Sequence, residues 1–383
     1  MSDHGKQDGT LPPGGVDVAA LAALFDGRRH SHGFLLFFAL LAALEERGGD
    51  GPVFLPIDEL VVRALAHAWV PRFTYRLSFG RGDRIGLVLD RLPDSLRTPE
   101  AVADPAELRL RLREAIPGDD LLRLGRYVLR RLIRPFFVAH LRPVPERVDR
   151  SLVVVARERL AAGGPMYRLD PARRLLEVDA SWREYLRDHG PMVRGWASWR
   201  WVQHLQARNP LALGLARKLL APAGRAVPEA ARRYWRAVVE RAPVRCLYSG
   251  DPLDPDRATL EPFVPWNFLG DDPLWNLVPV SPRAAAAKGD RFPETGFYLD
   301  ALAETQAAAI VAARDAFGRA ELGRSLEPFF AELRLQPELA LGDAPREWLA
   351  RALRVSYGET LRPLEALAGR QGFETGWRFS DVA

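Results

Sequence analysis

Histidine and cysteine are scarce in this chain of 383 residues. The one cysteine, Cys246, excludes an internal disulfide and leaves a cysteine-built zinc site without partners. Seven histidines are present, and the last of them is His204. Any chemistry in the part of the chain after His204 must therefore proceed without an imidazole. The lack of disulfides fits a reducing compartment, and we expect a bacterial, cytoplasmic protein.

Long apolar runs are also missing. The longest covers residues 34–44, which is 11 residues. That length is too short to span a bilayer, and the run lies too far from the N-terminus for a signal peptide. We expect it to form a core helix and expect no membrane partner.

Lysine is rare as well, so the basic character of the chain comes almost entirely from arginine. The formal net charge is +5, and the stretch from residue 190 to residue 245 holds 11 basic residues against two acidic ones. Such a concentration favours a polyanionic partner. With 48% hydrophobic and 27% charged residues, the chain is globular and long enough for two or three cores.

Periodicity and turn residues divide the chain into five parts. Residues 1–15 are predicted to form a disordered arm, 16–145 a helical domain, 146–240 a mixed helix and hairpin region, 241–297 a small ββα finger, and 298–383 a helical region. In the mixed region a helix through Arg159 precedes a hairpin over residues 166–170 and 174–179. The expected fold class is mainly α with a small ββα finger and a short β-hairpin, a multi-domain α+β chain.

Helices are predicted over residues 18–25, 33–47, 57–69, 105–116, 119–133, 193–206, 228–241, 299–317, 320–334 and 344–355. Two of these, residues 193–206 and 228–241, combine arginines with Trp196, Trp199, Trp201, Tyr234 and Trp235. One interpretation places the aromatic side chains in the core and the arginines on a solvated face. The other places them in a groove where arginine meets phosphate.

Residues 246–293 carry the most information about function. They begin with Cys246-Leu-Tyr-Ser-Gly-Asp, a turn signal between two strands, and continue through an aromatic-rich loop to Asn276-Leu-Val-Pro-Val, a short strand. A short helix follows, with the sequence Ala284-Ala-Ala-Ala-Lys-Gly-Asp. From the residues alone, the segment is a hairpin, a loop and a helix start.

This layout resembles the HNH endonuclease family, whose ββα-metal finger has the same order of elements. It is closest to the zinc-free bacterial type with a Cys-x-Tyr-x-Gly opening. The finger positions that match are Cys246, Tyr248, Gly250, Phe263, Pro265, Trp266, Trp275, Asn276, Leu277, Pro279, Lys288 and Asp290. Outside the finger, stretches beginning at Gly33, Ala68, Leu77, Arg134 and Leu205 are also similar to such proteins, so the resemblance extends to about residue 293.

The resemblance implies that an acidic residue and a later Asn or His hold one divalent metal, and that an adjacent His is the general base. Here Glu261 stands at the acidic position, Pro262 replaces the histidine and Ala285 replaces the second ligand. Pro262 cannot accept a proton and Ala285 cannot bind a metal. Asn276 is retained, with an implied role in bracing the loop. We therefore expect no catalytic residue and no metal, with Mg²⁺ on Glu261 only if the site is active.

The leading hypothesis is a nucleic-acid-binding or scaffolding protein on an inactivated HNH fold, a subunit of a bacterial nucleic-acid-processing or antiviral defence system with protein partners. DNA is favoured over RNA. The candidate contacts are Arg194, Arg200, Arg232, Arg233, Arg236, Arg245, Arg283, Lys288 and Arg291. One alternative is an active nuclease rebuilt with Asp271, Asp272, Asp290, His140 or His204. Another is a protein-interaction subunit without nucleic-acid contact.

Overall fold

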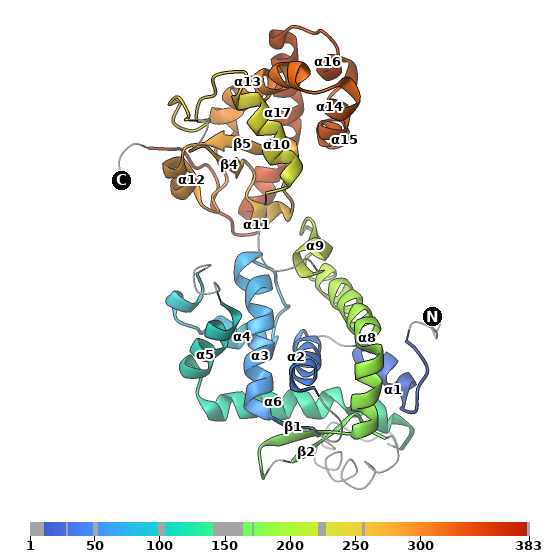
Figure 1. Ribbon diagram of the computed structural model, residues 1–383. Helices are drawn as coiled ribbons and strands as arrows, with labels where there is room; N and C mark the ends of the chain where they lie inside the picture. The colour runs from blue at the N-terminus through green and yellow to red at the C-terminus, as the bar shows by residue number, and fades with distance from the viewer. Residues whose placement is uncertain are drawn as a thin grey trace, which may run out of the picture. The chain divides into compact units, whose positions relative to one another are not determined.

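A computed structural model describes residues 11–27, 30–48, 53–98, 104–140, 164–170, 172–220, 227–254 and 257–380. The chain divides into two compact units, Met1–Pro210 and Leu211–Ala383. In Figure 1 the colour runs from blue to green along the first unit and from yellow-green to red along the second. The fold class expected from the sequence is confirmed, because the chain is mainly helical with two small antiparallel sheets.

Helices form most of the first unit, and carboxylates cap several of them. Asp17 accepts a hydrogen bond from the Ala20 N–H at 2.9 Å, and Asp179 accepts one from the Ser181 N–H at 2.9 Å. The elements are α1 (Val18–Ala22), η1 (Ala23–Phe25), α2 (His32–Arg47), α3 (Ile57–Trp69), the π-helical η2 (Val70–Thr74), α4 (Arg84–Leu89), η3 (Asp94–Leu96), α5 (Pro105–Ala115), α6 (Gly118–Leu132), η5 (Arg134–His140) and α8 (Ala180–Gln206). The apolar run that starts α2 is buried against α3, α6 and α8, as expected.

A three-stranded antiparallel sheet completes the first unit. Its order is β1 (Val53–Pro56), β3 (Leu175–Val178) and β2 (Tyr167–Asp170). The predicted hairpin is confirmed as β2 and β3. The pairing of β3 with β1 is a long-range contact that no local sequence pattern indicates. Through β1, the hairpin belongs with the N-terminal helices, whereas it was predicted to belong to the mixed region of residues 146–240. The predicted helix through Arg159 lies outside the described residues.

Residues 1–10 of the predicted arm are likewise outside the described part of the chain. Its remaining residues lie against the first unit. The hydroxyl of Tyr185 on α8 donates to the carbonyl of Pro12 at 2.7 Å, so this end of the arm is tied to the long helix.

The second unit combines the finger with helices on either side of it in sequence. Its elements are α9 (Leu215–Leu220), α10 (Glu229–Val239), β4 (Thr259–Pro262), α11 (Trp266–Leu269), η8 (Leu274–Asn276), β5 (Leu277–Val280), α12 (Pro282–Lys288), α13 (Thr295–Ala316), α14 (Arg319–Ser325), α15 (Glu327–Ala331), α16 (Pro337–Leu341) and α17 (Arg346–Arg370). The predicted helix over residues 320–334 is broken at Leu326, because Pro328 starts a new turn. The last helix continues through Pro363 to Arg370, well beyond the predicted end at residue 355.

The C-terminal helices share one hydrophobic core with the finger. The hydroxyl of Tyr357 on α17 donates to the carbonyl of Trp275 at 2.6 Å, and Gln306 on α13 donates to the carbonyl of Leu277 at 3.0 Å. Both contacts are buried, and they satisfy one backbone oxygen of η8 and one of the first residue of β5. Finger and C-terminal helices therefore form a single unit, rather than the separate regions 241–297 and 298–383.

Candidate functional site

The finger begins with a tight turn at Cys246. The Cys246 N–H donates to the carbonyl of Asp251 at 2.8 Å, and the Gly250 N–H donates to the carbonyl of Cys246 at 2.9 Å. Gly250 has a φ of 76°, which glycine adopts without steric cost. The buried sulfur of Cys246 accepts a hydrogen bond from the Ser281 N–H at 3.4 Å. Because Ser281 caps α12, this cysteine fixes where the finger helix starts.

Strands β4 and β5 and helix α12 position the residues at the family's catalytic places. Glu261 on β4 pairs with Val278, and Pro262 pairs with Leu277. A proline is tolerated because both strands of a two-stranded sheet are edges. In α12, Lys288 follows Ala285 by three residues, so the two side chains leave the same side of the helix.

The carboxylate of Glu261 is bound by the ammonium group of Lys288. Nζ of Lys288 donates to Oε1 of Glu261 at 3.0 Å and to the carbonyl of Gly289 at 3.3 Å. Lys288 is 0% exposed and Glu261 is 9% exposed. Burial of an ammonium needs such partners, because desolvation of an unpaired charge costs several kcal/mol. This burial corrects one expectation, since Lys288 is not available to contact phosphate.

These residues do not fit a divalent metal. The side chains of Pro262 and Ala285 offer no donor atom, and the carboxylate of Glu261 is already paired with a buried cation. At an effective dielectric constant of 20, two unit charges about 4 Å apart interact by about 4 kcal/mol, and a divalent ion doubles that repulsion from an ammonium. Mg²⁺ is commonly bound through one or two carboxylates, but carboxylates that are free to coordinate it. Glu261 is therefore the single side-chain donor among these three positions, and it is already paired.

Asn276 closes the loop between β4 and β5, as its retention suggested. Its side chain is fully buried, its Oδ1 accepts the Val264 N–H at 2.7 Å, and its Nδ2 donates to the Val264 carbonyl at 3.0 Å. One amide therefore satisfies both backbone groups of a buried residue. The backbone carbonyl of Asn276 also accepts the Phe263 N–H at 2.7 Å. The loop that follows Pro262 is therefore held in place although the position before it has no histidine.

Asn276→Ala is expected to lower the free energy of unfolding of the second unit by about 2–4 kcal/mol, because two buried backbone groups lose their partners. Denaturant titration followed by tryptophan fluorescence measures this. Gln203→Ala, an exposed amide on α8, is the matched control and is expected to change stability by less than about 0.5 kcal/mol. Equal stability of the Asn276→Ala and Gln203→Ala variants would contradict the bracing role.

Three of the side chains proposed for a rebuilt site, those of Asp271, Asp290 and His204, have partners of their own. Asp290 Oδ2 accepts a hydrogen bond from Asn267 at 2.6 Å, and Asp271 forms an ion pair with Arg217. His204 lies in the first unit, buried against Phe34 and 3.5 Å from the hydroxyl of Ser31. Burial lowers the pKa of His204 to about 3, aided by the positive charge of Arg208. His140 ends η5 in the same unit.

Helix α10 presents the most regular group of candidate phosphate contacts. Its buried face carries Tyr234 and Trp235, while Arg232, Arg233 and Arg236 are exposed. Arg232 and Arg236 line a pocket of about 410 Å³ that extends to β4 and β5. The interpretation that places the aromatic side chains in the core is confirmed for α10, where Tyr234 and Trp235 are buried and the arginines face solvent. Contact of these arginines with phosphate stays a prediction.

The remaining candidates are more dispersed. Arg245 donates to the carbonyl of Gly250 at 3.0 Å, Arg283 lies over the Phe379 ring at 5.7 Å, and Arg291 lies over the Trp377 ring at 5.5 Å. Arg194 and Arg200 belong to α8 in the first unit, where they pair with Glu45 and Asp26, each at 2.5 Å. Trp201 on that helix is buried, whereas Trp199 is 56% exposed. The predicted contacts therefore fall on two units rather than on one surface.

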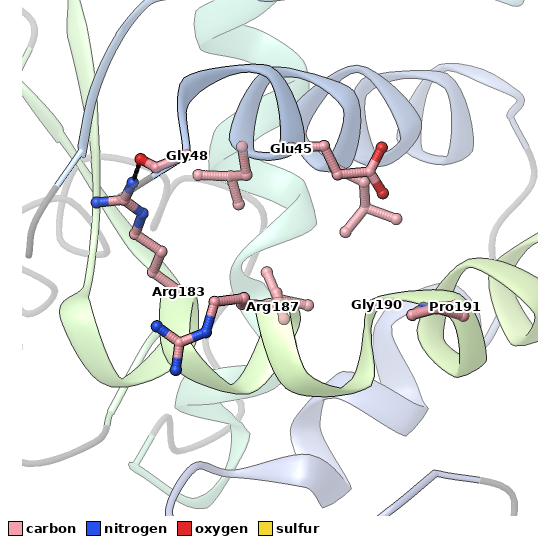
Figure 2. A pocket seen from close by; sticks show the side chains of 9 residues that line it. Glu45, Gly48, Arg183, Arg187, Gly190 and Pro191 are labelled. Atoms are coloured by element: carbon pink, nitrogen blue, oxygen red, sulfur yellow. Dashed lines mark hydrogen bonds between the residues drawn. The ribbon is translucent and has the colours of Figure 1, made fainter. Parts of the chain in front are cut away.

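A pocket of about 280 Å³ lies between α2 and α8 in the first unit (Figure 2). Arg183 reaches across it to donate to the carbonyl of Gly48, and Glu45 faces the pocket from α2. Gly190 has no Cβ to clash with the ring of Pro191, so α8 remains helical through this pair and leaves the space open. The apolar wall is built by Leu41, Leu44 and Leu186.

Three comparisons bear on these features. The model of a family described as HNH endonuclease matches residues 246–294, the segment with the Cys246 turn, the β4–β5 pair and α12. A search of curated proteins and a search of solved structures each returned no match. Within the described residues, none of the helices is both long enough and apolar enough to cross a bilayer.

Proposed function

Residues 246–294 are a finger of the HNH endonuclease family, and from this premise we propose that the chain binds nucleic acid through a fold that has lost nuclease activity. The observation that supports the loss most strongly is the absence of side-chain donors at Pro262 and Ala285, which supply neither a base nor a metal ligand. The remaining carboxylate, that of Glu261, is held in a buried ion pair with Lys288. Loss of a general base alone typically costs about 10²- to 10⁴-fold in rate.

The residues that hold the finger together are retained, and this supports a continuing role for the finger. Asn276 keeps its bridge to Val264, and Cys246 keeps its contact with the start of α12. Exposed arginines on α10, together with the net charge of +5, supply positive potential beside the β4–β5 pair of the finger. DNA is the proposed ligand, bound mainly through its phosphates.

Filter binding of labelled duplex DNA, single-stranded DNA and RNA to the full chain tests this proposal. The expected result is binding at low salt that weakens steeply as salt rises, with duplex DNA bound at least as tightly as RNA. A linear fall of log K with log salt measures the number of phosphates neutralised, with a slope of about −0.9 per phosphate on duplex DNA. Absence of binding to all three ligands at low salt would overturn the proposal.

We further propose that the protein is a subunit of a bacterial system for nucleic-acid processing or antiviral defence. Exposed apolar side chains on α17 support a protein partner: Trp348 is 66% exposed and Val355 is 57% exposed. A partner that co-purifies in stoichiometric amount from the native host, even after nuclease treatment, is the expected result. Loss of every partner on nuclease treatment would contradict it.

A further inference from the structure

Two histidines and an aspartate meet in the first unit, far along the chain from the finger. His30 and His32 flank Ser31 at the start of α2, and Asp83 begins α4. One ligand atom from each of His30, His32 and Asp83 lies within 4.8 Å of the other two. Nδ1 of His32 is 3.8 Å from Oδ2 of Asp83, and the two imidazole rings stack with centroids 5.2 Å apart.

Backbone hydrogen bonds hold the aspartate in this position. Oδ2 of Asp83 accepts the Ser31 N–H at 2.6 Å, and Oδ1 accepts the Gly86 N–H at 3.0 Å. Asp83 is 1% exposed and His32 is 6% exposed, whereas His30 is half-buried. The carboxylate therefore links the starts of two helices and brings His32 beside it, while His30 leaves one side open to solvent.

The burial of this carboxylate favours a cation beside it, because Asp83 is 1% exposed. A buried carboxylate of this kind is stabilised by a nearby positive charge. The side chain of Arg208, which donates to the carbonyl of His204 at 2.8 Å, interacts electrostatically with Asp83 and would compete for that role.

We propose that His30, His32 and Asp83 form a binding site for one divalent transition-metal ion in the first unit. Two imidazoles and one carboxylate suit Zn²⁺ and related first-row ions, and three protein ligands leave a position for water or another ligand. Bonds to zinc are about 2.0–2.2 Å long and its sites are usually tetrahedral, so two ligand atoms on one ion lie about 3.3–3.6 Å apart. The three ligand atoms here lie within 4.8 Å of one another, so they must approach by roughly 1 Å, and the His30 ring is the least buried of the three side chains. The site depends neither on the finger nor on the proposed function.

Metal binding by the full chain tests the site. Zn²⁺ content after removal of excess ion, with Co²⁺ absorption as the spectroscopic readout, should show one ion per chain. His32→Ala and Asp83→Asn are expected to weaken Zn²⁺ binding by more than the roughly 10- to 100-fold typical of outer-shell changes. Asparagine caps a helix about as well as aspartate, so Asp83→Asn preserves the start of α4.

His189→Ala, Asp179→Asn and Glu261→Ala are the controls. They remove a histidine of the same unit, a capping carboxylate of α8 and the finger carboxylate, and each is expected to leave Zn²⁺ stoichiometry and affinity unchanged. Three results would overturn the proposal. These are failure of the wild-type chain to retain Zn²⁺, binding by His32→Ala and Asp83→Asn equal to wild type, or loss of the ion on Glu261→Ala.

Discussion

Lys288→Met is expected to lower the free energy of unfolding of the second unit by about 3–5 kcal/mol, the cost of removing one partner from a buried ion pair. The substitution leaves the Glu261 carboxylate in a nearly closed site without the ammonium that lies 3.0 Å from it. Methionine keeps much of the length and apolar character of the lysine stem, so lost packing contributes little. Denaturant titration with tryptophan fluorescence reports the change, since Trp275 lies in the same core.

A double-mutant cycle separates this charge effect from a packing effect. Glu261→Gln combined with Lys288→Met removes both charges, and this variant is expected to regain most of the stability that Lys288→Met alone loses. Arg346→Met breaks an exposed ion pair with Glu304 in the same unit and is expected to cost at most about 1 kcal/mol. If Lys288→Met lowers the free energy of unfolding no more than Arg346→Met does, the buried ion pair of Glu261 with Lys288 does not stabilise the finger.

Charge reversal on α10 is expected to produce the largest loss of nucleic-acid binding. Replacing Arg232, Arg233 and Arg236 by glutamate removes up to three phosphate contacts, which lowers the magnitude of the salt slope by about 2–3 on duplex DNA. Affinity at low salt is expected to fall by at least about 100-fold, because three repulsive charges also replace three attractive ones. Filter binding across a series of salt concentrations measures both quantities.

Reversal of Arg346, Arg351 and Arg354 on α17 is the matched control for α10. It changes the net charge of the same unit by the same amount, and it also breaks surface ion pairs, with Glu304 and Asp300. It is expected to leave most of the salt slope intact. An equal loss of slope in the two triple variants would show that net charge, and not α10, determines binding. Circular dichroism melts of both variants show whether α10 tolerates the change, since Arg233 pairs with Glu321.

Local elements were largely predictable from the sequence, whereas long-range partners were not. The helix over residues 57–69 and the hairpin before α8 were confirmed, because each is specified by apolar periodicity or by its own turn residues. The pairing of β1 with β3 joins segments more than a hundred residues apart, which no local pattern encodes. The same holds for the buried bonds from Gln306 and Tyr357 that join the C-terminal helices to the finger.

The candidate site shows the same division. The family pattern indicated, from the sequence alone, which residues stand at its catalytic positions. They are Glu261, Pro262, Asn276 and Ala285, and the family model matches residues 246–294. The burial of Lys288 was not, because a lysine at a helix end has no local signal that separates a phosphate contact from an internal ion pair. The His30, His32 and Asp83 cluster was missed as well. Its local signal is the His-Ser-His sequence, but Asp83 joins it through tertiary contacts with Ser31 and His32.

Binding without cleavage is tested by incubating the purified full chain with end-labelled DNA in Mg²⁺, Mn²⁺, Ni²⁺ and Zn²⁺ in turn. The bound fraction and the strand length are read from the same samples. We expect DNA that is retained by the protein and remains intact with every metal. Metal-dependent cleavage that disappears in Glu261→Ala would contradict this expectation, because that result would place a working nuclease centre at the carboxylate that Lys288 neutralises.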